Sequence, residues 1–178
     1  MHWRGIKSKP VATDTNEFFV SDLYQKLRFV QHPKTRERYL SVISESNPDS
    51  ISYDYIKVND TYKTPSEHLE EKNFDKALEG LLAIKEKDSM SEFINQYKFN
   101  RIGYRYIRDN NFEDAIGVLE MNTKLHPSSP NTYDSLGQAY LVSGDSLNAY
   151  HNYKKAYNLN KGNRRAQKYI DAYESKMD

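Results

Sequence analysis

Apolar residues in the first third of the chain recur with a period of two, which predicts β-strands. Short runs rich in Phe, Tyr, Val, Ile and Leu alternate with polar residues, so that their apolar side chains share one face. Turn residues around Pro33 and Pro48 separate the runs. Because loops this short join antiparallel strands, residues 1–62 predict a small antiparallel β-meander of three or four strands, at 17–23, 25–31, 38–45 and 51–58.

After Thr64 the apolar period changes to 3.6, which predicts amphipathic helices. Thr64 suits an N-cap, because Pro65 follows at the first helical position and Glu67 lies in the first turn. The short linkers make neighbouring helices antiparallel. The predicted fold class is therefore α+β, with the β module at 1–62 and an α-α superhelical array of hairpins at 63–178; its helices are expected at 65–72, 74–87, 91–109, 112–125, 131–143, 146–159 and 163–176.

A sequence repeat of fixed length organises the helical part. Gly103 recurs as Gly137, and Ala115 recurs as Ala149 at the same interval. A glycine inside a helix costs about 1 kcal/mol relative to alanine, so we expect a close approach of the partner helix there, with the alanines as the opposing small surface. The aromatic and aliphatic residues around each glycine also match, as Phe99, Ile102 and Tyr106 in one copy and Tyr133, Leu136 and Tyr140 in the next.

This pattern of an aromatic residue, Leu-Gly, Tyr, Ala, Phe and Pro resembles the tetratricopeptide repeat family, and the interval between the copies agrees with the repeat length of that family. The resemblance implies full units at 96–129 and 130–163, a degenerate unit at 65–90 and a solvating cap helix at 163–177. Asn122 and Lys161 depart from the pattern, since a small residue and a proline are usual there. So few units are marginal for a free-standing solenoid, and we expect the β module or a larger protein to cover one end.

In this family the first helix of each unit lines a concave groove that binds a peptide or partner domain. Amides and aromatics suit an extended peptide or a helix, although each side chain could instead pack internally or be merely solvated. The family members that bind C-terminal carboxylates use Lys and Asn, and because Tyr104 replaces the second Asn we expect no such clamp here. The resemblance assigns to the groove Tyr97, Asn100, Tyr104 and Arg108 in one unit, and Asn131, Asp134, Gln138 and Leu141 in the next.

Charge and composition point away from several kinds of chemistry. Lys and Arg total 26 against 25 Asp and Glu, a net charge of +1, which argues against a polyanion binder held by bulk charge. We expect no nucleic-acid partner, although basic residues gather between Lys154 and Lys168. The absence of cysteine excludes disulfides and thiolate chemistry, and the five histidines lack metal-ligand spacing. No cofactor, metal or catalytic residue is therefore expected, and the chain is predicted not to be an enzyme.

A weaker resemblance links residues 16–20, 27–30 and 132–140 to the C-terminal tail of bacterial β-lactamase-related serine hydrolases. The catalytic Ser-x-x-Lys of that family does not occur in the chain, and Lys63-Thr64-Pro65 lacks the glycine of its Lys-Thr-Gly motif.

Two functions remain open: an interaction or scaffold module that binds a protein or peptide, and an accessory tail that docks on a hydrolase catalytic domain. From the sequence we expect neither a signal peptide nor a membrane-spanning run. We expect a periplasmic location for the tail of an exported hydrolase, and a cytoplasmic one otherwise.

Overall fold

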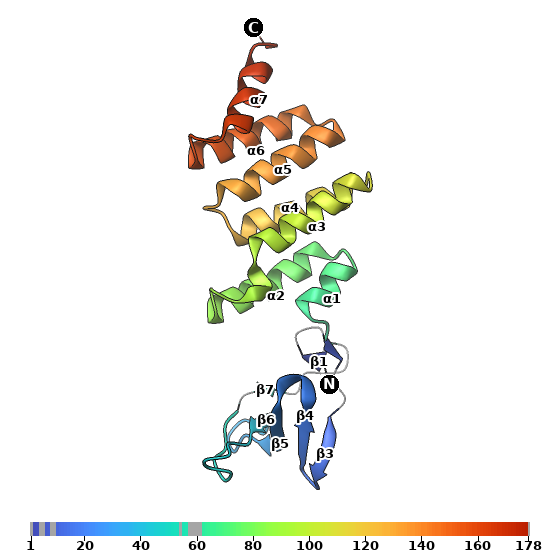
Figure 1. Ribbon diagram of the computed structural model, residues 1–178, viewed down its shortest axis with the longest axis vertical. Helices are drawn as coiled ribbons and strands as arrows, with labels where there is room; N and C mark the ends of the chain where they lie inside the picture. The colour runs from blue at the N-terminus through green and yellow to red at the C-terminus, as the bar shows by residue number, and fades with distance from the viewer. Residues whose placement is uncertain (1, 4–5, 8–9, 54, 57–61, 178) are drawn as a thin grey trace. The chain divides into compact units, whose positions relative to one another are not determined.

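The computed structural model divides the chain into two compact units, Met1–Lys63 and Thr64–Asp178 (Figure 1). It describes residues 2–3, 6–7, 10–53, 55–56 and 62–177. Strands occupy the first unit and helices the second, which confirms the predicted α+β class.

The first unit holds a short antiparallel pair, β1 (His2–Trp3) with β2 (Ile6–Lys7), and a five-stranded antiparallel meander in the order β3-β4-β5-β6-β7. The predicted meander is confirmed, with one more strand than expected. The added strand is at the edge, where all its residues are exposed and give no alternating signal. The strands of the meander are β3 (Val11–Asp14), β4 (Glu17–Val20), β5 (Gln25–Gln31), β6 (Arg38–Val42) and β7 (Tyr55–Ile56).

Three of the predicted strands are shorter than expected, and the one predicted at 38–45 ends at Val42. The strand predicted at 17–23 stops at Val20, because Ser21–Leu23 forms a 3₁₀ turn and Tyr24 takes a left-handed φ of 51°. The strand predicted at 51–58 is represented by β7, and residues 54 and 57–58 lie outside the described residues. The register places Phe18 opposite Leu27, and Leu27 opposite Val42, so these side chains share the apolar face of the sheet.

The helical unit begins at the predicted capping box. The backbone N–H of Glu67 donates to Oγ1 of Thr64 at 3.2 Å, and the backbone N–H of Thr64 donates to Oε2 of Glu67 at 2.8 Å. The helix predicted at 91–109 is split, because the side chain of Asn95 accepts from the N–H of Tyr97 and starts a new helix after a 3₁₀ turn, Glu92–Ile94. The helices are α1 (Pro65–Glu70), α2 (Phe74–Lys87), α3 (Gln96–Arg108), α4 (Phe112–Leu125), α5 (Pro130–Ser143), α6 (Ser146–Leu159) and α7 (Arg164–Glu174).

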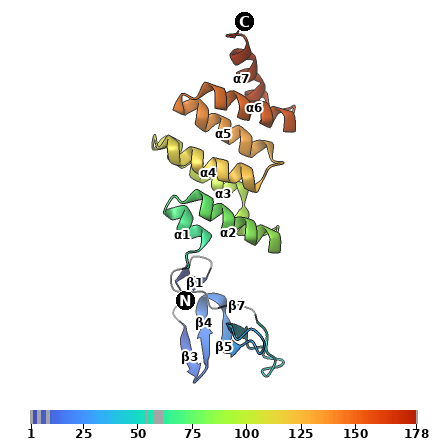
Figure 2. The ribbon, with the colours of Figure 1, turned by 180° about the vertical axis from the view of Figure 1, so that it is seen from behind.

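Successive helices pack as hairpins, α1 with α2, α3 with α4 and α5 with α6, and α3 also contacts α5. In Figure 1, α3 and α5 lie in front of α4 and α6, and the reverse view in Figure 2 agrees. The helices α3, α5 and α7 begin at residues 96, 130 and 164, at equal intervals. The predicted cap helix α7 therefore starts at the same place in the repeat as the first helices α3 and α5.

At each glycine, a large side chain of the second helix packs directly against the backbone of the first helix. A Cβ atom on Gly103 would lie 2.5 Å from Cγ of Leu119, and one on Gly137 would lie 3.0 Å from Cγ of Tyr153. Leu119 is fully buried and Tyr153 almost so. The atoms nearest to each glycine belong to the side chain one helical turn after Ala115 and Ala149, so these larger side chains fill the space at the glycines.

The two glycines should respond differently to substitution by alanine. Gly103→Ala forces a methyl group onto a branched carbon fixed in the core, so we expect it to lower the free energy of unfolding by about 2 kcal/mol, even after the gain in helix propensity. Gly137→Ala needs a shift of only a few tenths of an ångström, so its cost should be below about 1 kcal/mol. Urea unfolding followed by circular dichroism measures both, and equal costs would contradict the packing described.

Candidate binding surface

The first helices carry side chains at repeated positions on one face. Tyr97 of α3, Asn131 of α5 and Arg165 of α7 each stand second in their helix, one repeat apart, and all three are exposed. Tyr97 is 66% exposed, which is high for an aromatic side chain. Residues of three separate helices can therefore contact one ligand, on a surface that we define as the first-helix face.

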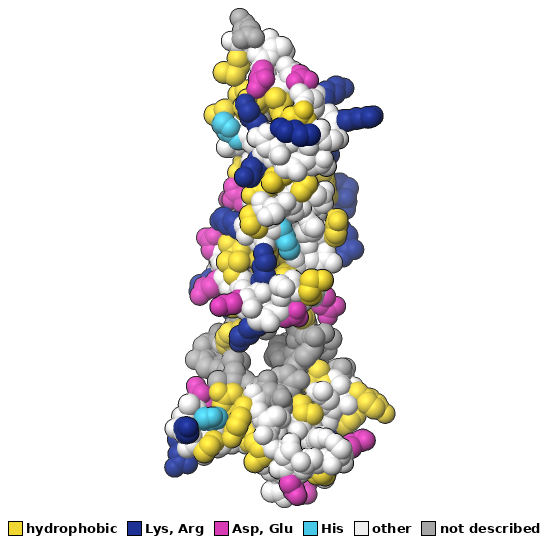
Figure 3. Space-filling model, turned by 90° about the vertical axis from the view of Figure 1, so that its left-hand side faces the viewer, with side chains coloured by type: hydrophobic (Ala, Val, Ile, Leu, Met, Phe, Trp, Pro, Cys, Tyr) yellow, Lys and Arg dark blue, Asp and Glu magenta, His cyan; other side chains and the backbone are white. Residues whose placement is uncertain are grey.

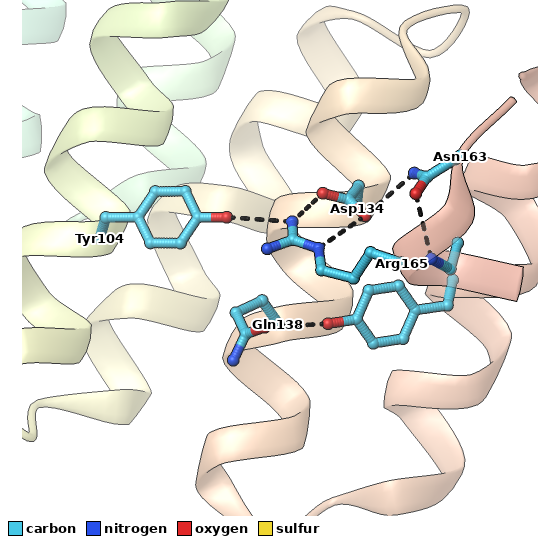
Figure 4. Close-up of polar contacts among 7 residues, drawn as sticks. Tyr104, Asp134, Gln138, Asn163 and Arg165 are labelled. Atoms are coloured by element: carbon cyan, nitrogen blue, oxygen red, sulfur yellow. Dashed lines mark hydrogen bonds and ion pairs between the residues drawn. The ribbon is translucent and has the colours of Figure 1, made fainter. Parts of the chain in front are cut away.

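Arg165 of α7 contacts residues of α5 and α3 on this face (Figure 4). Its Nε donates to Oδ1 of Asp134 at 3.2 Å, and its Nη2 forms an ion pair with Oδ2 of the same carboxylate. Nη2 also donates to the hydroxyl oxygen of Tyr104 at 3.3 Å. The guanidinium is thus held in a fixed orientation by α5 and α3. Its other terminal nitrogen, Nη1, has no hydrogen bond to any described residue.

Asp134 is held from a second side as well. Nδ2 of Asn163 donates to Oδ1 of Asp134 at 3.0 Å, while Oδ1 of Asn163 caps α7 by accepting from the N–H of Ala166 at 3.0 Å. Asp134 is 8% exposed, so its charge is compensated by Arg165 rather than by water. The same contact therefore positions both the start of α7 and the arginine.

Gln138 lies beside this network and accepts a hydrogen bond from the hydroxyl of Tyr153 at 3.1 Å (Figure 4). Tyr153 is 1% exposed, and its burial raises the pKa of its phenol above the ordinary value. Tyr153, which fills the space at Gly137, therefore also orients the side-chain amide of Gln138.

Asn100 is buried, although it was assigned to the groove. Its Oδ1 accepts from Nδ2 of Asn122 at 2.9 Å, and the same Nδ2 donates to the backbone oxygen of Gln96 at 3.0 Å. Asn122 is fully buried, and this pairing explains why a polar residue stands where the repeat pattern has a small one. The side chain of Asn100 thus belongs to the contact between α3 and α4.

The eight assigned residues therefore fall into three groups. Tyr104 and Asp134 bind Arg165, Gln138 accepts from Tyr153 beside them (Figure 4), and Asn100 is internal. The remaining four are exposed: Tyr97, Arg108, Asn131 and Leu141. The predicted groove does not include Arg165, because the sequence predicts a solvated cap helix at 163–177. Its position one repeat after Asn131 is the signal that identifies it.

Among the described residues, no three His, Cys, Asp or Glu side chains are grouped so that they could hold a metal ion. Within the same part of the chain, every helix is too short or too polar to cross a bilayer.

No protein-family model matches the chain. It is 33% identical over 100 residues to the heat shock protein STI1 of Saccharomyces cerevisiae, a match that covers 56% of this chain and only 16% of STI1. Among solved structures, the first TPR of Spaghetti (RPAP3) bound to the HSP90 peptide SRMEEVD is 16% identical, with a TM-score of 0.44 over 64% of this chain and 86% of that one.

Two further solved structures are similar at the same level. PcrH in complex with the chaperone binding region of PopD is 16% identical, with a TM-score of 0.44 over 64% of this chain and 88% of that one. MamA is 20% identical, with a TM-score of 0.42 over 64% of this chain and 60% of that one.

Paired helices that repeat at a constant interval decide the architecture. The helical unit is an array of tetratricopeptide-like hairpins. In this array, Tyr97, Tyr104, Asn131 and Asp134 lie on the first helices α3 and α5, whereas Asn100 is part of the contact between α3 and α4. The resemblance of other segments to serine hydrolase tails stays a prediction, to which the relatives named above add no support.

We expect the Asp134–Arg165 contact to stabilise the unit measurably. In a double-mutant cycle with Asp134→Ala and Arg165→Ala, the coupling energy should be about 1–2 kcal/mol, because the carboxylate is buried and bonded through both oxygens. The control is the Lys154–Glu174 pair, whose side chains are 50% and 51% exposed; its coupling should stay below about 0.5 kcal/mol. Equal coupling in the two cycles, measured by urea unfolding, would rule out the role assigned to Arg165.

The raised pKa of Tyr153 predicts a loss of stability in alkali. The neutral phenol is favoured in the folded state, so this stability is complete below the unfolded pKa and is lost as the pH rises through the folded pKa. Between about pH 8 and pH 11, Tyr153→Phe should therefore lose less stability than the parent chain. Urea unfolding at both pH values tests this, and an equal loss in the two proteins would refute it.

Proposed function

We propose that the helical unit is a non-enzymatic interaction module that binds an extended segment of a partner protein along the first-helix face. The observation that carries the proposal is the network of Tyr104, Asp134 and Arg165, which connects α3, α5 and α7 on that face. Helices packed about 8–10 Å apart present equivalent side chains at the spacing of roughly every third residue of an extended chain.

The chemistry of the face also suits a polypeptide. Tyr97 offers a large rigid contact surface, Asn131 offers an amide that can pair with a peptide backbone, and Arg165 presents a free N–H that is already oriented. Because the network fixes the arginine before binding, little conformational entropy is lost there when a ligand arrives. The match to STI1 supports such a module, although the chain covers only 16% of that protein.

The test uses a peptide selected from a random display library on the full chain. Tyr97→Ala with Asn131→Ala should weaken binding of the selected peptide at least about tenfold in fluorescence polarisation. Both side chains are exposed, so the unfolding midpoint should not change. Asn100→Ala does not serve here, because it removes the buried hydrogen-bond acceptor of Asn122. The substitution would therefore lower the free energy of unfolding of the helical unit.

The matched control is Leu147→Ala with Asn158→Ala, two exposed residues of the second helix α6. This pair should leave the affinity unchanged. If the control weakens binding as much as the first-helix pair, or if the first-helix pair has no effect, the face assigned here is not the binding surface.

A further inference from the structure

An unpaired row of positive charge runs along α3. Its members are spaced by three, four and three residues, which places them on one side of the helix. Each is exposed, and α3 contains no acidic residue. We call this row the α3 basic stripe; it consists of Lys98, Arg101, Arg105 and Arg108.

Three cations of the helical unit have acidic partners, whereas the members of the stripe do not. Lys72 pairs with Asp114, Lys154 with Glu174 and Arg165 with Asp134. No member of the stripe forms an ion pair with a described residue. Like charges four residues apart on a helix repel each other by a few tenths of a kcal/mol, so the stripe is a surface on which an anionic group gains free energy.

The stripe borders the first-helix face. Tyr97, Arg101, Tyr104 and Arg108 succeed each other at intervals of four, three and four, so the tyrosines of the face and two arginines of the stripe form one continuous side of α3. Figure 3 shows dark blue side chains along the right-hand edge of the helical unit. A ligand on the first-helix face therefore lies within reach of guanidinium groups.

The dimensions of the stripe fit a polypeptide. From Lys98 to Arg108 the helix rises about 15 Å, the length of four or five residues of an extended chain. Three of the four cations are arginines, whose planar groups bind carboxylates through two hydrogen bonds. The net charge of the chain is only +1, and Asp109 and Glu113 follow the stripe, which disfavours a longer polyanion such as RNA.

We infer that an acidic stretch of about four to six residues within the partner polypeptide binds along the α3 basic stripe. This inference rests on the proposed function and adds the chemistry of the partner. Recognition is by side-chain carboxylates, so a terminal carboxylate is not required. The tyrosines of α3 contact the backbone and aliphatic parts of this stretch, and the rest of the partner segment crosses α5 and α7.

The probe is fluorescein-labelled hexaglutamate flanked by Gly-Ser and amidated at its C-terminus, added to the full chain. It should bind, shift backbone amide resonances of α3 in NMR spectra, and lose affinity as salt is raised. Arg101→Glu with Arg105→Glu should weaken binding at least about tenfold. The control Lys76→Glu with Lys124→Glu makes the same change in net charge on α2 and α4 and should change affinity less than about twofold.

Other outcomes overturn the inference. These are the absence of probe binding, an equal effect of the two charge-reversal pairs, and equally tight binding of an oligouridylate of about twelve nucleotides or of vesicles with about 20% phosphatidylserine. Failure of the proposed function is seen separately. If the display-selected peptide responds to Tyr97→Ala with Asn131→Ala but not to the arginine reversals, the groove stands and the acidic partner does not.

Discussion

The entry of Leu119 and Tyr153 into the spaces left by Gly103 and Gly137 fixes the geometry of the helical unit. A side chain of the second helix takes the place of a Cβ atom on the first, so the two helices approach closely and in one register. Because this contact recurs in the next repeat, successive hairpins take the same arrangement. The first helices then repeat on one side, and the first-helix face follows from that repetition.

The hydrogen bonds of Arg165 depend on this arrangement of the helices and do not produce it. Arg165 reaches Asp134 and Tyr104 only because α7, α5 and α3 follow each other along one face. In return, Asn163 ties the start of α7 to α5 through the same carboxylate. A helix whose sequence suggests a solvating cap thus contributes a central residue of the proposed surface, and the charge of that residue is balanced there. The α3 basic stripe has no such balance, which is why it gives the surface its preference for an acidic partner.

The sequence predicts features that depend on local spacing. The glycines recur at a fixed interval in the sequence, and the capping box at Thr64 is a local motif. Apolar and polar residues alternate along the predicted strands of the meander. All three features could therefore be predicted from the sequence. The strand β3 could not, because it is exposed throughout and gains its place only by pairing with β4. The burial of Asn100 depends on Asn122, which belongs to another helix. The role of Arg165 likewise depends on contacts between helices that spacing alone does not reveal.

The most direct test of the close approach at Gly103 is to measure Gly103→Ala in two backgrounds. In the parent chain the new methyl group collides with Leu119, and the free energy of unfolding should fall. In a Leu119→Ala background the collision is gone, so the same substitution should raise the free energy of unfolding by about 1 kcal/mol through helix propensity. A fall of equal size in both backgrounds would contradict the account.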